Sequence, residues 1–493
     1  MRLTMSFTLN DPNLLKTGLF IDGEFLRSET DGKRLDVSNP ANGSILANIA
    51  SATKEETEAA ISAAETAQIS WSKTTAKERA AYLQRWYQLV LQHVDDLAII
   101  LTAEQGKVLA EAKGEIIYGA NYIEWFAEEA KRIYGDIIPQ PANDKRIVCV
   151  KQPVGVVACI TPWNFPNAML TRKIAPALAA GCTVVCKMAS ETPLSALALA
   201  ELANRAGIPK GVINMVAGSA SVIGPVLTES PVIRKLSFTG STEVGKMLLE
   251  QCAGTVKKVS MELGGNAPFI IFDDADIDSA IDGIMLSKYR NSGQTCVCSN
   301  RIFVQNSVYD QVKDKLVEAV SNRINLGDGQ TEGSTHGPLI NDSAVNDVQS
   351  LVDTSITEGA ELLLGGKVSE LGGRFYEPTI LGKVTNDMPV AQNEIFGPVA
   401  PLIGFDTEQE VIAMANDTDV GLASYFYSRD VGRVWRVSEA LEYGIVGVNE
   451  GIISNEMAPF GGVKESGMGR EGSKYGLDDY LEIKYICMGG LES

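Results

Sequence analysis

Residues 183–216 read TVVCKMASETPLSALALAELANRAGIPKGVINMV, and their pattern sets the class of the fold. Two short apolar runs, 183–186 and 212–216, flank an Ala- and Leu-rich run at helical spacing, 193–206. Thr192-Pro193 is typical of a capped helix start, because proline in the first turn needs no hydrogen-bond acceptor. Short apolar strands that alternate with amphipathic helices predict a parallel, doubly wound sheet.

Further strand-like runs lie on both sides of this stretch, at 146–151, 154–160 and 235–238. Residues 270–440 repeat the mixed α/β texture, so a second α/β unit is expected. The tail 479–488 is also strand-like and needs a strand to pair with. Parallel sheets bind ligands beyond the carboxyl ends of their strands, so the residues that follow the apolar runs are the first candidates for a site.

Residues 53–132 precede these strands and are predicted to be helical. Thr53-Lys-Glu-Glu56 and Thr75-Ala-Lys-Glu78 both fit the capping box, in which the threonine oxygen and the glutamate carboxylate accept exposed N–H groups at a helix start. An amphipathic run at 82–101 contains His93, which is expected there as a solvated or packed side chain.

At 493 residues the chain exceeds what one hydrophobic core normally serves, so two or three domains are expected. A formal net charge of −19 argues against nucleic acid and anionic membrane surfaces as partners. No apolar run approaches the ~18 residues of a spanning helix, and the first ten residues lack a signal core, so a cytoplasmic location is expected. The eight cysteines are expected to be reduced thiols rather than a disulfide framework.

Histidine is scarce, since only His93 and His336 occur and neither lies in a catalytic motif. A Ser-His-Asp triad, a Cys-His pair and a multi-histidine metal site therefore lack their residues, and no metal is expected. Any general base is expected to be a carboxylate.

Residues 291–301, Asn-Ser-Gly-Gln-Thr-Cys-Val-Cys-Ser-Asn-Arg, place Cys296 after a small and polar run that lets a ligand approach the backbone. A structural cysteine usually lies among apolar neighbours, where the thiol is an inert hydrophobe. Cys296 is therefore a candidate nucleophile. If Cys296 is considered alone, a loop cysteine with no catalytic role is an equal interpretation.

Six motifs follow one another along the chain: Pro162-Trp-Asn-Phe-Pro166, Lys187, Phe238-Thr-Gly-Ser-Thr-Glu-Val-Gly245, Met261-Glu-Leu-Gly-Gly-Asn266, Gly293-Gln-Thr-Cys296 and Glu394-Ile-Phe-Gly-Pro398. Together they closely resemble the aldehyde dehydrogenase superfamily over essentially the whole chain. The resemblance implies an α/β fold with a parallel Rossmann-type cofactor domain, an α/β catalytic domain and a small β oligomerisation arm. The implied boundaries are 1–133 and 153–264 for the cofactor domain, 265–464 for the catalytic domain, and 134–152 and 465–493 for the arm and tail. In this family the arm pairs between subunits, which implies a homodimer or homotetramer.

An aldehyde gives up hydride only after its carbon has become a tetrahedral alkoxide, and a thiolate forms that alkoxide and leaves a thioester. The resemblance gives this role to Cys296, with Asn164 and the Cys296 backbone N–H as donors to the oxyanion. Glu262 follows an apolar strand, which should raise the pKa of its carboxyl and suits a base that activates water. Outside the motifs, Asn164 would be a turn residue and Glu262 an exposed residue at a strand end.

The chain lacks the Gly-x-Gly-x-x-Gly fingerprint, and the segment from Gly240 to Gly245 stands in its place, with N–H groups at a helix start that can receive a phosphate. The resemblance implies contacts to the dinucleotide from Pro162, Trp163, Lys187, Ser190, Gly240, Ser241, Gly245, Glu394 and Phe396. Relatives that favour NAD often carry glutamate at the position of Ser190, where it repels a 2′-phosphate. Serine removes that repulsion and adds a donor beside the Lys187 charge, so NADP is the expected cofactor and NAD the alternative.

Arg172 and Arg290 lie near the two catalytic motifs, and arginine binds a carboxylate through two parallel hydrogen bonds. Either arginine alone is more often a surface ion-pair partner, but the pair resembles the succinate-semialdehyde dehydrogenase pattern. That pattern adds Ser454 as a third donor, and Phe165 and Phe460 as aromatic walls. The predicted reaction is oxidation of succinate semialdehyde to succinate. Glutarate semialdehyde or another short ω-carboxy aldehyde is the alternative substrate, because one methylene is worth only ~1–3 kcal/mol.

Two further alternatives concern the site as a whole and its second thiol. A catalytically silent protein on this fold is the main hypothesis of another class, and the intact set Cys296, Glu262 and Asn164 argues against it. Cys298 is a redox candidate, because a sulfenic acid can condense with a neighbouring thiol, and the resemblance points the same way. A one-residue gap strains a Cys296–Cys298 ring, so a packing role for Cys298 is an equal alternative.

Overall fold

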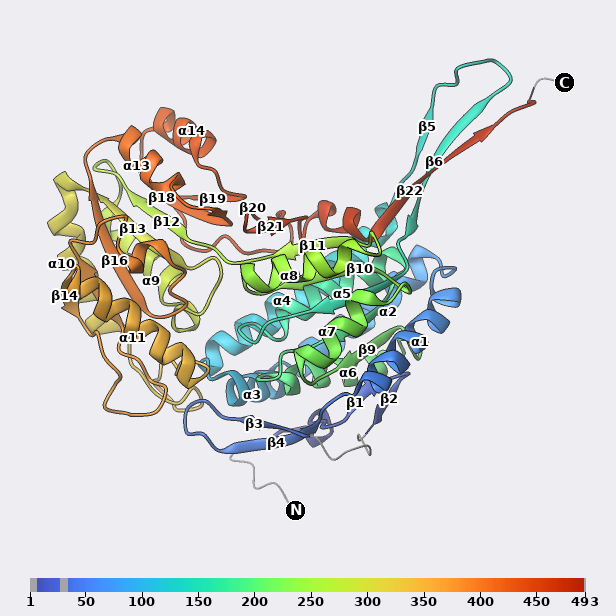
Figure 1. The fold of residues 1–493 in the computed structure, drawn as a ribbon, viewed down its shortest axis with the longest axis horizontal. Helices are drawn as coiled ribbons and strands as arrows, with labels where there is room; N and C mark the ends of the chain where they lie inside the picture. The colour runs from blue at the N-terminus through green and yellow to red at the C-terminus, as the bar shows by residue number, and fades with distance from the viewer. Residues whose placement is uncertain (1–6, 27–33, 492–493) are drawn as a thin grey trace.

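The computed structural model describes residues 7–26 and 34–491, which form two α/β lobes and a narrow β arm (Figure 1). Residues 1–6, part of the N-terminal stretch in which no signal core is expected, lie outside this description. Within the described ranges, no helix has both the length and the apolar composition that crossing a membrane requires.

The N-terminal helices are α1 (Lys54–Trp71), α2 (Ala76–Gln92), α3 (Val94–Gln105) and α4 (Leu109–Glu129). Both predicted capping boxes are present: Thr53 and Thr75 each accept from a glutamate N–H, and the same glutamates accept from the threonine N–H groups. The amphipathic run 82–101 is not one helix, because His93, with φ −110° and ψ 19°, ends α2 and precedes α3.

The sheet of the first lobe has the strand order β2-β1-β9-β8-β7-β10-β11-β21. Its strands are β1 (Leu19–Ile21), β2 (Glu24–Leu26), β7 (Val156–Ile160), β8 (Thr183–Lys187), β9 (Ile213–Val216), β10 (Ile233–Thr239), β11 (Lys258–Glu262) and β21 (Gly467–Met468). The strands from β9 to β11 all run parallel, which confirms the predicted doubly wound sheet. The strand order reverses between β7 and β10, so the loops after these two strands face the crevice where such sheets bind ligands.

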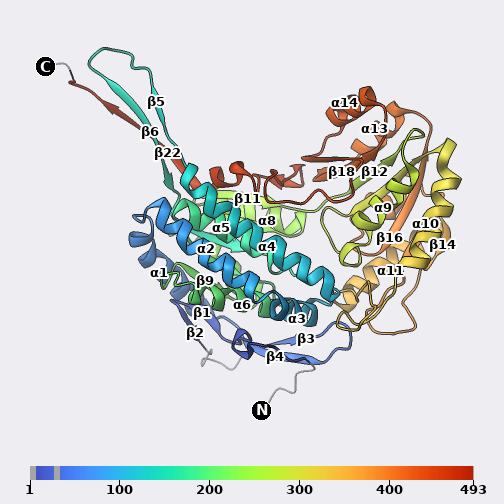
Figure 2. The same cartoon turned by 180° about the vertical axis from the view of Figure 1, so that it is seen from behind.

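The helices that follow these strands are α5 (Ala168–Ala180), α6 (Pro193–Arg205), α7 (Ala220–Glu229) and α8 (Thr242–Ala253). From behind, α2, α4 and α5 lie side by side across one face of the lobe (Figure 2). This layer buries the apolar side chains of α5 and separates the sheet from solvent.

The start of α6 is capped from a distant part of the chain. Thr192 makes no side-chain cap bond, and its hydroxyl donates to the Trp163 carbonyl at 3.4 Å. The buried Glu104 carboxylate, near the end of α3, instead accepts from the N–H groups of Leu194 (2.7 Å) and Ser195 (2.8 Å). The expected Thr192 cap is therefore wrong, because a carboxylate lies at the positive end of the helix dipole in its place.

The sheet of the second lobe has the order β14-β15-β16-β13-β12-β18-β19, and all neighbours except β14 and β15 run parallel. Its strands are β12 (Ala267–Ile271), β13 (Ser299–Gln305), β14 (Glu361–Leu364), β15 (Thr379–Gly382), β16 (Val399–Phe405), β18 (Ala423–Tyr427) and β19 (Ile445–Val448). Its helices are α9 (Ile277–Lys288), α10 (Tyr309–Arg323), α11 (Asp342–Thr357), α12 (Pro389–Gln392), α13 (Glu408–Asn416) and α14 (Val431–Ala440). Residues 263–266 lead directly from the end of β11 to the start of β12, so this linker joins the two sheets.

Smaller elements complete the described chain. Two short antiparallel pairs are β3 (Arg34–Ser38) with β4 (Ile45–Ala50), and β17 (Val420–Gly421) with β20 (Val463–Lys464). The 3-10 turns are η1 (Pro12–Leu14), η2 (Ala130–Arg132), η3 (Arg290–Gly293), η4 (Asn306–Val308) and η5 (Lys474–Tyr480).

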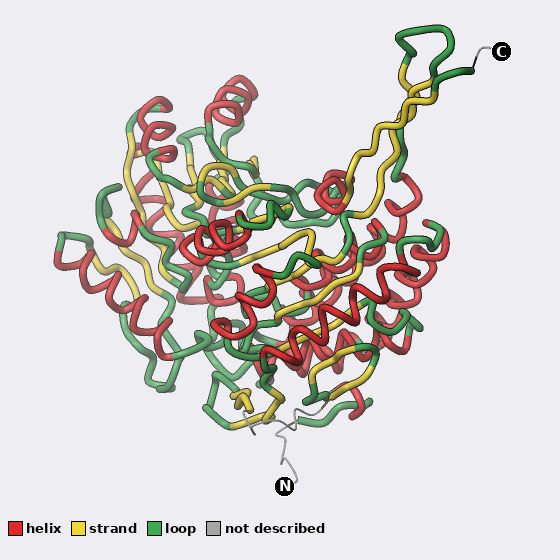
Figure 3. Tube along the Cα trace, turned by 45° about the vertical axis from the view of Figure 1, so that its right-hand side comes forward, coloured by secondary structure: helices red, strands yellow, loops and turns green. Residues whose placement is uncertain are grey.

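The arm is an antiparallel sheet of β5 (Asp136–Ile138), β6 (Arg146–Pro153) and β22 (Leu481–Met488) that projects from the first lobe (Figure 3). Its apolar side chains are unusually exposed, with Ile137 at 84% and Ile483 at 72%. Such a surface favours pairing with another chain, and subunit pairing stays a prediction. The domain boundaries also stay a prediction, and β21, inside the expected tail, pairs with β11 of the first sheet.

The α6 cap gives a testable prediction. Glu104→Ala should lower the free energy of unfolding by ~2–3 kcal/mol, because two buried N–H groups lose their acceptor. Thr192→Ala is the matched control and should lower it by only ~1 kcal/mol, because its buried hydroxyl loses one long hydrogen bond but caps nothing. Urea unfolding of both variants measures the two changes in the free energy of unfolding. A larger decrease for Thr192→Ala than for Glu104→Ala would show that Thr192 caps the helix after all.

Candidate active site

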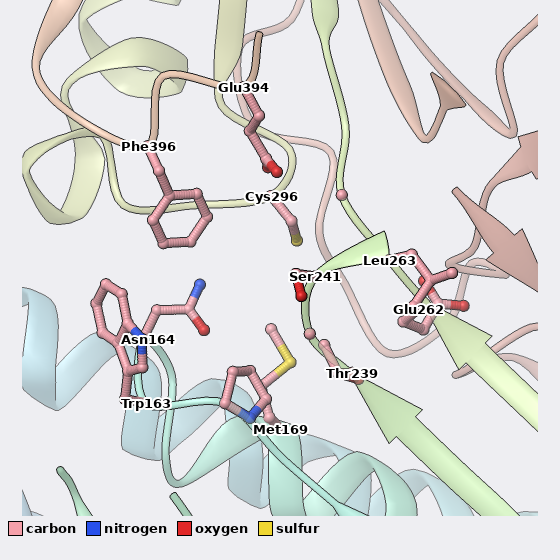
Figure 4. Close-up of a pocket in the computed structure, with 13 residues that line it drawn as sticks. Trp163, Asn164, Met169, Thr239, Ser241, Glu262, Leu263, Cys296, Glu394 and Phe396 are labelled. Carbon is pink, nitrogen blue, oxygen red and sulfur yellow. The ribbon is translucent and has the colours of Figure 1, made fainter. Parts of the chain in front are cut away.

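A cavity of about 250 Å³ lies where the carboxyl edge of the first sheet meets the second lobe (Figure 4). The first lobe contributes the loop after β7, part of α5 and the ends of β10 and β11, and the second lobe contributes the loops before β13 and β16. The lining residues are Pro162, Trp163, Asn164, Met169, Thr239, Gly240, Ser241, Glu262, Leu263, Gly264, Cys296, Glu394 and Phe396. The fold thus brings Asn164, Glu262 and Cys296 together from three separate segments.

Cys296 follows a strained turn. Asn291, Ser292 and Gly293 have φ values of 51°, 54° and 78°, a left-handed conformation that non-glycine residues rarely adopt. A Cβ at Gly293 would lie 2.1 Å from the carbonyl oxygen of Gly397, so the Cys296 loop and the segment 394–398 pack backbone against backbone. Strain of this kind persists where the surrounding structure imposes it, and it is common at active sites.

The Cys296 side chain is half-buried at the wall of the cavity. Burial is the main cause that raises its pKa, to about 12, with the charges of Glu394 and Glu262 adding and that of Arg172 opposing. Among the described residues, the Cys296 backbone N–H has no protein acceptor. The resting side chain is therefore a neutral thiol beside a free N–H donor.

Asn164 is buried, and Figure 4 shows its amide pointing into the same space as Cys296. Its Nδ2 donates to the Gln294 carbonyl at 3.1 Å, which uses one of its two N–H groups. The second N–H is free to meet an oxygen that develops beside Cys296, as an oxyanion donor must.

Glu262 ends β11 and is buried, and its Oε2 has no hydrogen-bond partner. Burial raises the pKa of this carboxyl well above its usual value, the nearby Glu471 raises it further, and the Arg172 charge opposes both. A raised pKa makes the carboxylate a stronger base, which agrees with the direction expected for a water-activating residue.

The dinucleotide candidates divide into three groups. Gly240 and Ser241 line the cavity at the N-terminus of α8, where Ser241 accepts from the Val244 N–H at 3.4 Å. Gly245 is not among the lining residues: a Cβ there would lie 2.4 Å from Leu263 Cδ2, so this glycine permits close packing of α8, and its contact with a dinucleotide stays a prediction. Lys187 ends β8, beside β7, and the Ser190 hydroxyl donates to the Gly218 carbonyl at 3.4 Å.

The opposite wall of the cavity carries Glu394 and an aromatic pair. Burial raises the pKa of Glu394 to about 7, and its Oε1 has no hydrogen-bond partner. The rings of Phe396 and Trp163 meet edge to face with centroids 5.5 Å apart. A carboxylate oxygen without a partner, an aromatic wall and a helix N-terminus together fit a nicotinamide dinucleotide.

The two candidate arginines differ in their surroundings. Arg172, on α5, is buried: its Nε donates to Glu471, its Nη2 has no partner, and its guanidinium lies 4.1 Å from the Phe460 ring centroid. Arg290 is half-buried and lies 5.0 Å from the Phe165 ring centroid, and no described carboxylate forms an ion pair with it. Arg172 is thus partly committed to the protein, whereas Arg290 is available to a ligand.

The predicted aromatic walls lie beside the cavity rather than in its lining. Phe165 packs with Met169, which lines the cavity, and Phe460 belongs to the same packed cluster as Cys296. Ser454 is half-buried in the segment after β19.

Glu471 is a site residue that no local sequence pattern indicates. It accepts from Arg172 Nε and from Lys173 Nζ, the latter at 2.5 Å, across about 300 residues of chain. The available signal is indirect: two adjacent cations in an apolar helix require a buried carboxylate partner.

The Cys298 thiol does not line the cavity that Cys296 faces. Its Sγ donates to the Lys288 carbonyl at 3.0 Å, and burial raises its pKa. Both thiols are free, and a bond between them would first require this hydrogen bond to break. Within the described residues, no group of three or more His, Cys, Asp or Glu side chains is placed to hold a metal ion.

Comparisons with known proteins agree with this geometry. The chain is 60% identical to the 3-sulfolactaldehyde dehydrogenase of Pseudomonas putida, over 98% of this chain and 99% of the relative. It is 59% identical to the succinate-semialdehyde dehydrogenase [NADP(+)] of Escherichia coli K12 (98% and 99% covered) and 57% identical to the glutarate-semialdehyde dehydrogenase of Pseudomonas aeruginosa (98% and 100% covered). A crystal structure of an E. coli NADP-dependent enzyme matches with a TM-score of 0.97 at 59% identity, over 98% of this chain and 100% of that one.

The family model described as "Aldehyde dehydrogenase family" matches residues 25–486. That match covers the second sheet, the first sheet except β1 and the first residue of β2, the cavity between the sheets and nearly all of the arm. The chain therefore belongs to the aldehyde dehydrogenase family and is an oxidoreductase.

Proposed function

We propose that this aldehyde dehydrogenase oxidises succinate semialdehyde to succinate, with NADP favoured over NAD. The observation that carries the substrate assignment is Arg290, which packs on Phe165 without any carboxylate partner among the described residues. Phe165 packs in turn with Met169 in the cavity wall, and this proximity to the cavity supports a role for Arg290 in holding the distal carboxylate of a short aldehyde.

In the proposed mechanism, the Cys296 thiol releases its proton to solvent, and the thiolate then adds to the aldehyde carbon. The new oxyanion accepts hydrogen bonds from the free Asn164 N–H and from the Cys296 backbone N–H, and losing one such donor costs ~3 kcal/mol. A bound nicotinamide supplies the acceptor for the hydride that leaves this carbon. Loss of hydride restores the C=O bond and leaves a thioester on Cys296.

Hydrolysis of that thioester requires Glu262. Its raised pKa favours the protonated carboxyl, so Glu262 first releases a proton to solvent, and the carboxylate then takes a proton from an attacking water. The C–S bond breaks, the carboxylic acid product leaves, and Cys296 regains its thiol. The free Oε2 of Glu262 is the acceptor available for the proton of that water.

Two related substrates compete with this assignment. Glutarate semialdehyde is longer by one methylene, and 3-sulfolactaldehyde carries a sulfonate in place of the carboxylate. The names of close relatives support all three substrates. Arg290, the free Nη2 of Arg172 and Ser454 suit any short aldehyde with a distal anion, so a direct comparison is needed.

The cofactor proposal depends on Ser190 and Lys187. Ser190 places no charge next to the expected 2′-phosphate, and Lys187 forms no ion pair within the described residues. A relative with NADP in its name supports the same preference.

The arm, with its exposed Ile137 and Ile483, supports a homodimer or homotetramer.

A steady-state panel tests the proposed function. Succinate semialdehyde, glutarate semialdehyde, 3-sulfolactaldehyde and neutral butanal are compared with NADP by kcat/KM. The expected order places succinate semialdehyde first and butanal at least ~100-fold lower, in line with ~3 kcal/mol for one charge-assisted contact. A higher value for either other anionic substrate would reassign the substrate, and equal use of butanal would remove anion recognition altogether.

Glu262→Gln should separate the two halves of the reaction. Hydride transfer does not need the base, so the variant should release one equivalent of reduced cofactor and then stall at the thioester. Stopped-flow absorbance measures the burst, and Cys296→Ala is the control that should show none. Unchanged steady turnover of Glu262→Gln would mean that another group activates the water.

Arg290→Ala should lower kcat/KM for succinate semialdehyde by ~100-fold while changing that for butanal less than ~3-fold, because only the charged substrate loses a partner. Arg290→Lys keeps the charge but loses the planar pair of N–H donors. Its kcat/KM for succinate semialdehyde should lie between those of the wild type and Arg290→Ala. Equal losses on the charged and neutral aldehydes would show that Arg290 only supports Phe165.

Ser190→Glu should move the preference from NADP toward NAD. A carboxylate there would repel the 2′-phosphate, a clash that costs a few kcal/mol. The ratio of kcat/KM for NADP over NAD is the readout, and Ser190→Gln serves as the uncharged control. If Ser190→Glu leaves the ratio at the wild-type value, cofactor choice lies elsewhere.

A further inference from the structure

Lys107, in the connection between α3 and α4, has a completely buried side chain. Its Nζ forms an ion pair with Glu115 Oε2 at 2.6 Å and donates to the Asn164 carbonyl at 2.8 Å. The same ammonium lies 3.8 Å from the Phe165 ring centroid. Lys107 thus contacts the oxyanion donor and the aromatic wall that follows it, although 57 positions separate it from Asn164.

Glu115 extends this contact to the start of α5. Its second oxygen, Oε1, accepts from the N–H groups of Asn167 at 2.9 Å and Ala168 at 3.2 Å. The α5 N-terminus has no side-chain cap of its own, so this carboxylate replaces one. The backbone of residues 164–168 is therefore held at one end by Lys107 and at the other by Glu115.

The Cys296 side of the cavity is tied to the same helix. Asn291 Nδ2 donates to the Asn164 carbonyl at 3.1 Å, and the Asn291 N–H donates to Glu111 at 2.9 Å. Glu111 and Glu115 are four residues apart on α4 and so lie on one face of it. The two loops that carry the oxyanion donors are thus fixed against each other by α4 and Lys107.

Stability alone does not account for this arrangement. An ion pair without solvent contact loses the hydration of both charges, and a well-packed apolar pair of similar size is often as stable. The side chain of Asn164 has a single hydrogen bond, to Gln294, so the direction of its second N–H depends on where the backbone at 164 is held. A shift of about 1 Å in a catalytic group is enough to cost ~100-fold in rate.

We propose that Lys107, held by Glu115, is a positioning residue that sets the Asn164 amide for the oxyanion. The proposal depends on the oxyanion role of Asn164 in the proposed function. It assigns Lys107 no contact with the substrate or the dinucleotide.

A double-mutant cycle tests it. Lys107→Met, which keeps the length of the side chain and removes the ammonium, is measured alone and with Asn164→Ala. The readouts are the burst rate constant for reduced cofactor and, independently of activity, the NADP Kd from fluorescence titration. Lys107→Met alone should lower the burst rate by ~10–100-fold, part of the ~100–1,000-fold lost with one oxyanion donor. It should change the NADP Kd less than twofold.

In the Asn164→Ala background, Lys107→Met should lower the burst rate less than ~2-fold further, because the group that it positions is gone. The proposal would be overturned if Lys107→Met lowered the burst rate equally in the wild-type and Asn164→Ala backgrounds, or if it did not lower it in the wild-type background. If Lys107→Met does not fold, Glu115→Gln, which weakens the hold on Lys107, is measured in the same two backgrounds with the same criterion.

Asn164→Ala alone separates this proposal from the proposed mechanism. If that variant keeps the wild-type burst rate, the oxyanion assignment itself is wrong. In the other outcome, Asn164→Ala lowers the burst rate while Lys107→Met causes the same further loss in the wild-type and Asn164→Ala backgrounds. In that case the oxyanion role of Asn164 stands, and only the positioning role of Lys107 is wrong.

Discussion

Burial of ionisable groups in a single cavity is the constraint on which the rest of this active site depends. Cys296, Glu262 and Glu394 line that cavity, the pKa of each is raised, and burial is the largest cause in every case. Burial therefore disfavours the charged form of all three side chains, and charge that develops during the reaction needs donors that are already in place. Donors fixed in advance stabilise such charge far better in a dry cavity than in water.

Buried ion pairs lie behind two of the catalytic side chains. Glu471 accepts from both Arg172 and Lys173 behind Glu262, and Glu115 pairs with Lys107 behind Asn164. These pairs satisfy buried cations and at the same time fix the segments that carry the catalytic side chains. Arg290 forms no ion pair with a described carboxylate, which supports the proposal that it binds a distal anionic group on the substrate.

Much of this arrangement could be predicted from the sequence, because its signals are local. Apolar runs and capping boxes gave the parallel sheet and the starts of α1 and α2, and the family motifs gave Asn164, Glu262, Cys296 and Glu394, which share one cavity. The remaining features are contacts between distant segments. Glu104 caps α6 from about 90 residues away and Glu471 pairs with Arg172 across about 300, and no local spacing encodes either partner. Gly245 was assigned to the dinucleotide by its motif, but its close approach to Leu263 became visible only in the fold.

The central claim, that burial keeps the resting nucleophile neutral, is tested most directly by the pH dependence of Cys296 alkylation. The protein without ligands reacts with iodoacetamide across a pH series, and peptide mass mapping gives the rate at Cys296, with the exposed Cys487 as an internal reference for reagent access. The account predicts a rate at Cys296 that is still rising at ~pH 10, beyond the ~8.5 at which an ordinary cysteine titrates. A rate that levels off with a midpoint near or below ~pH 8 would show a thiolate at rest and contradict it.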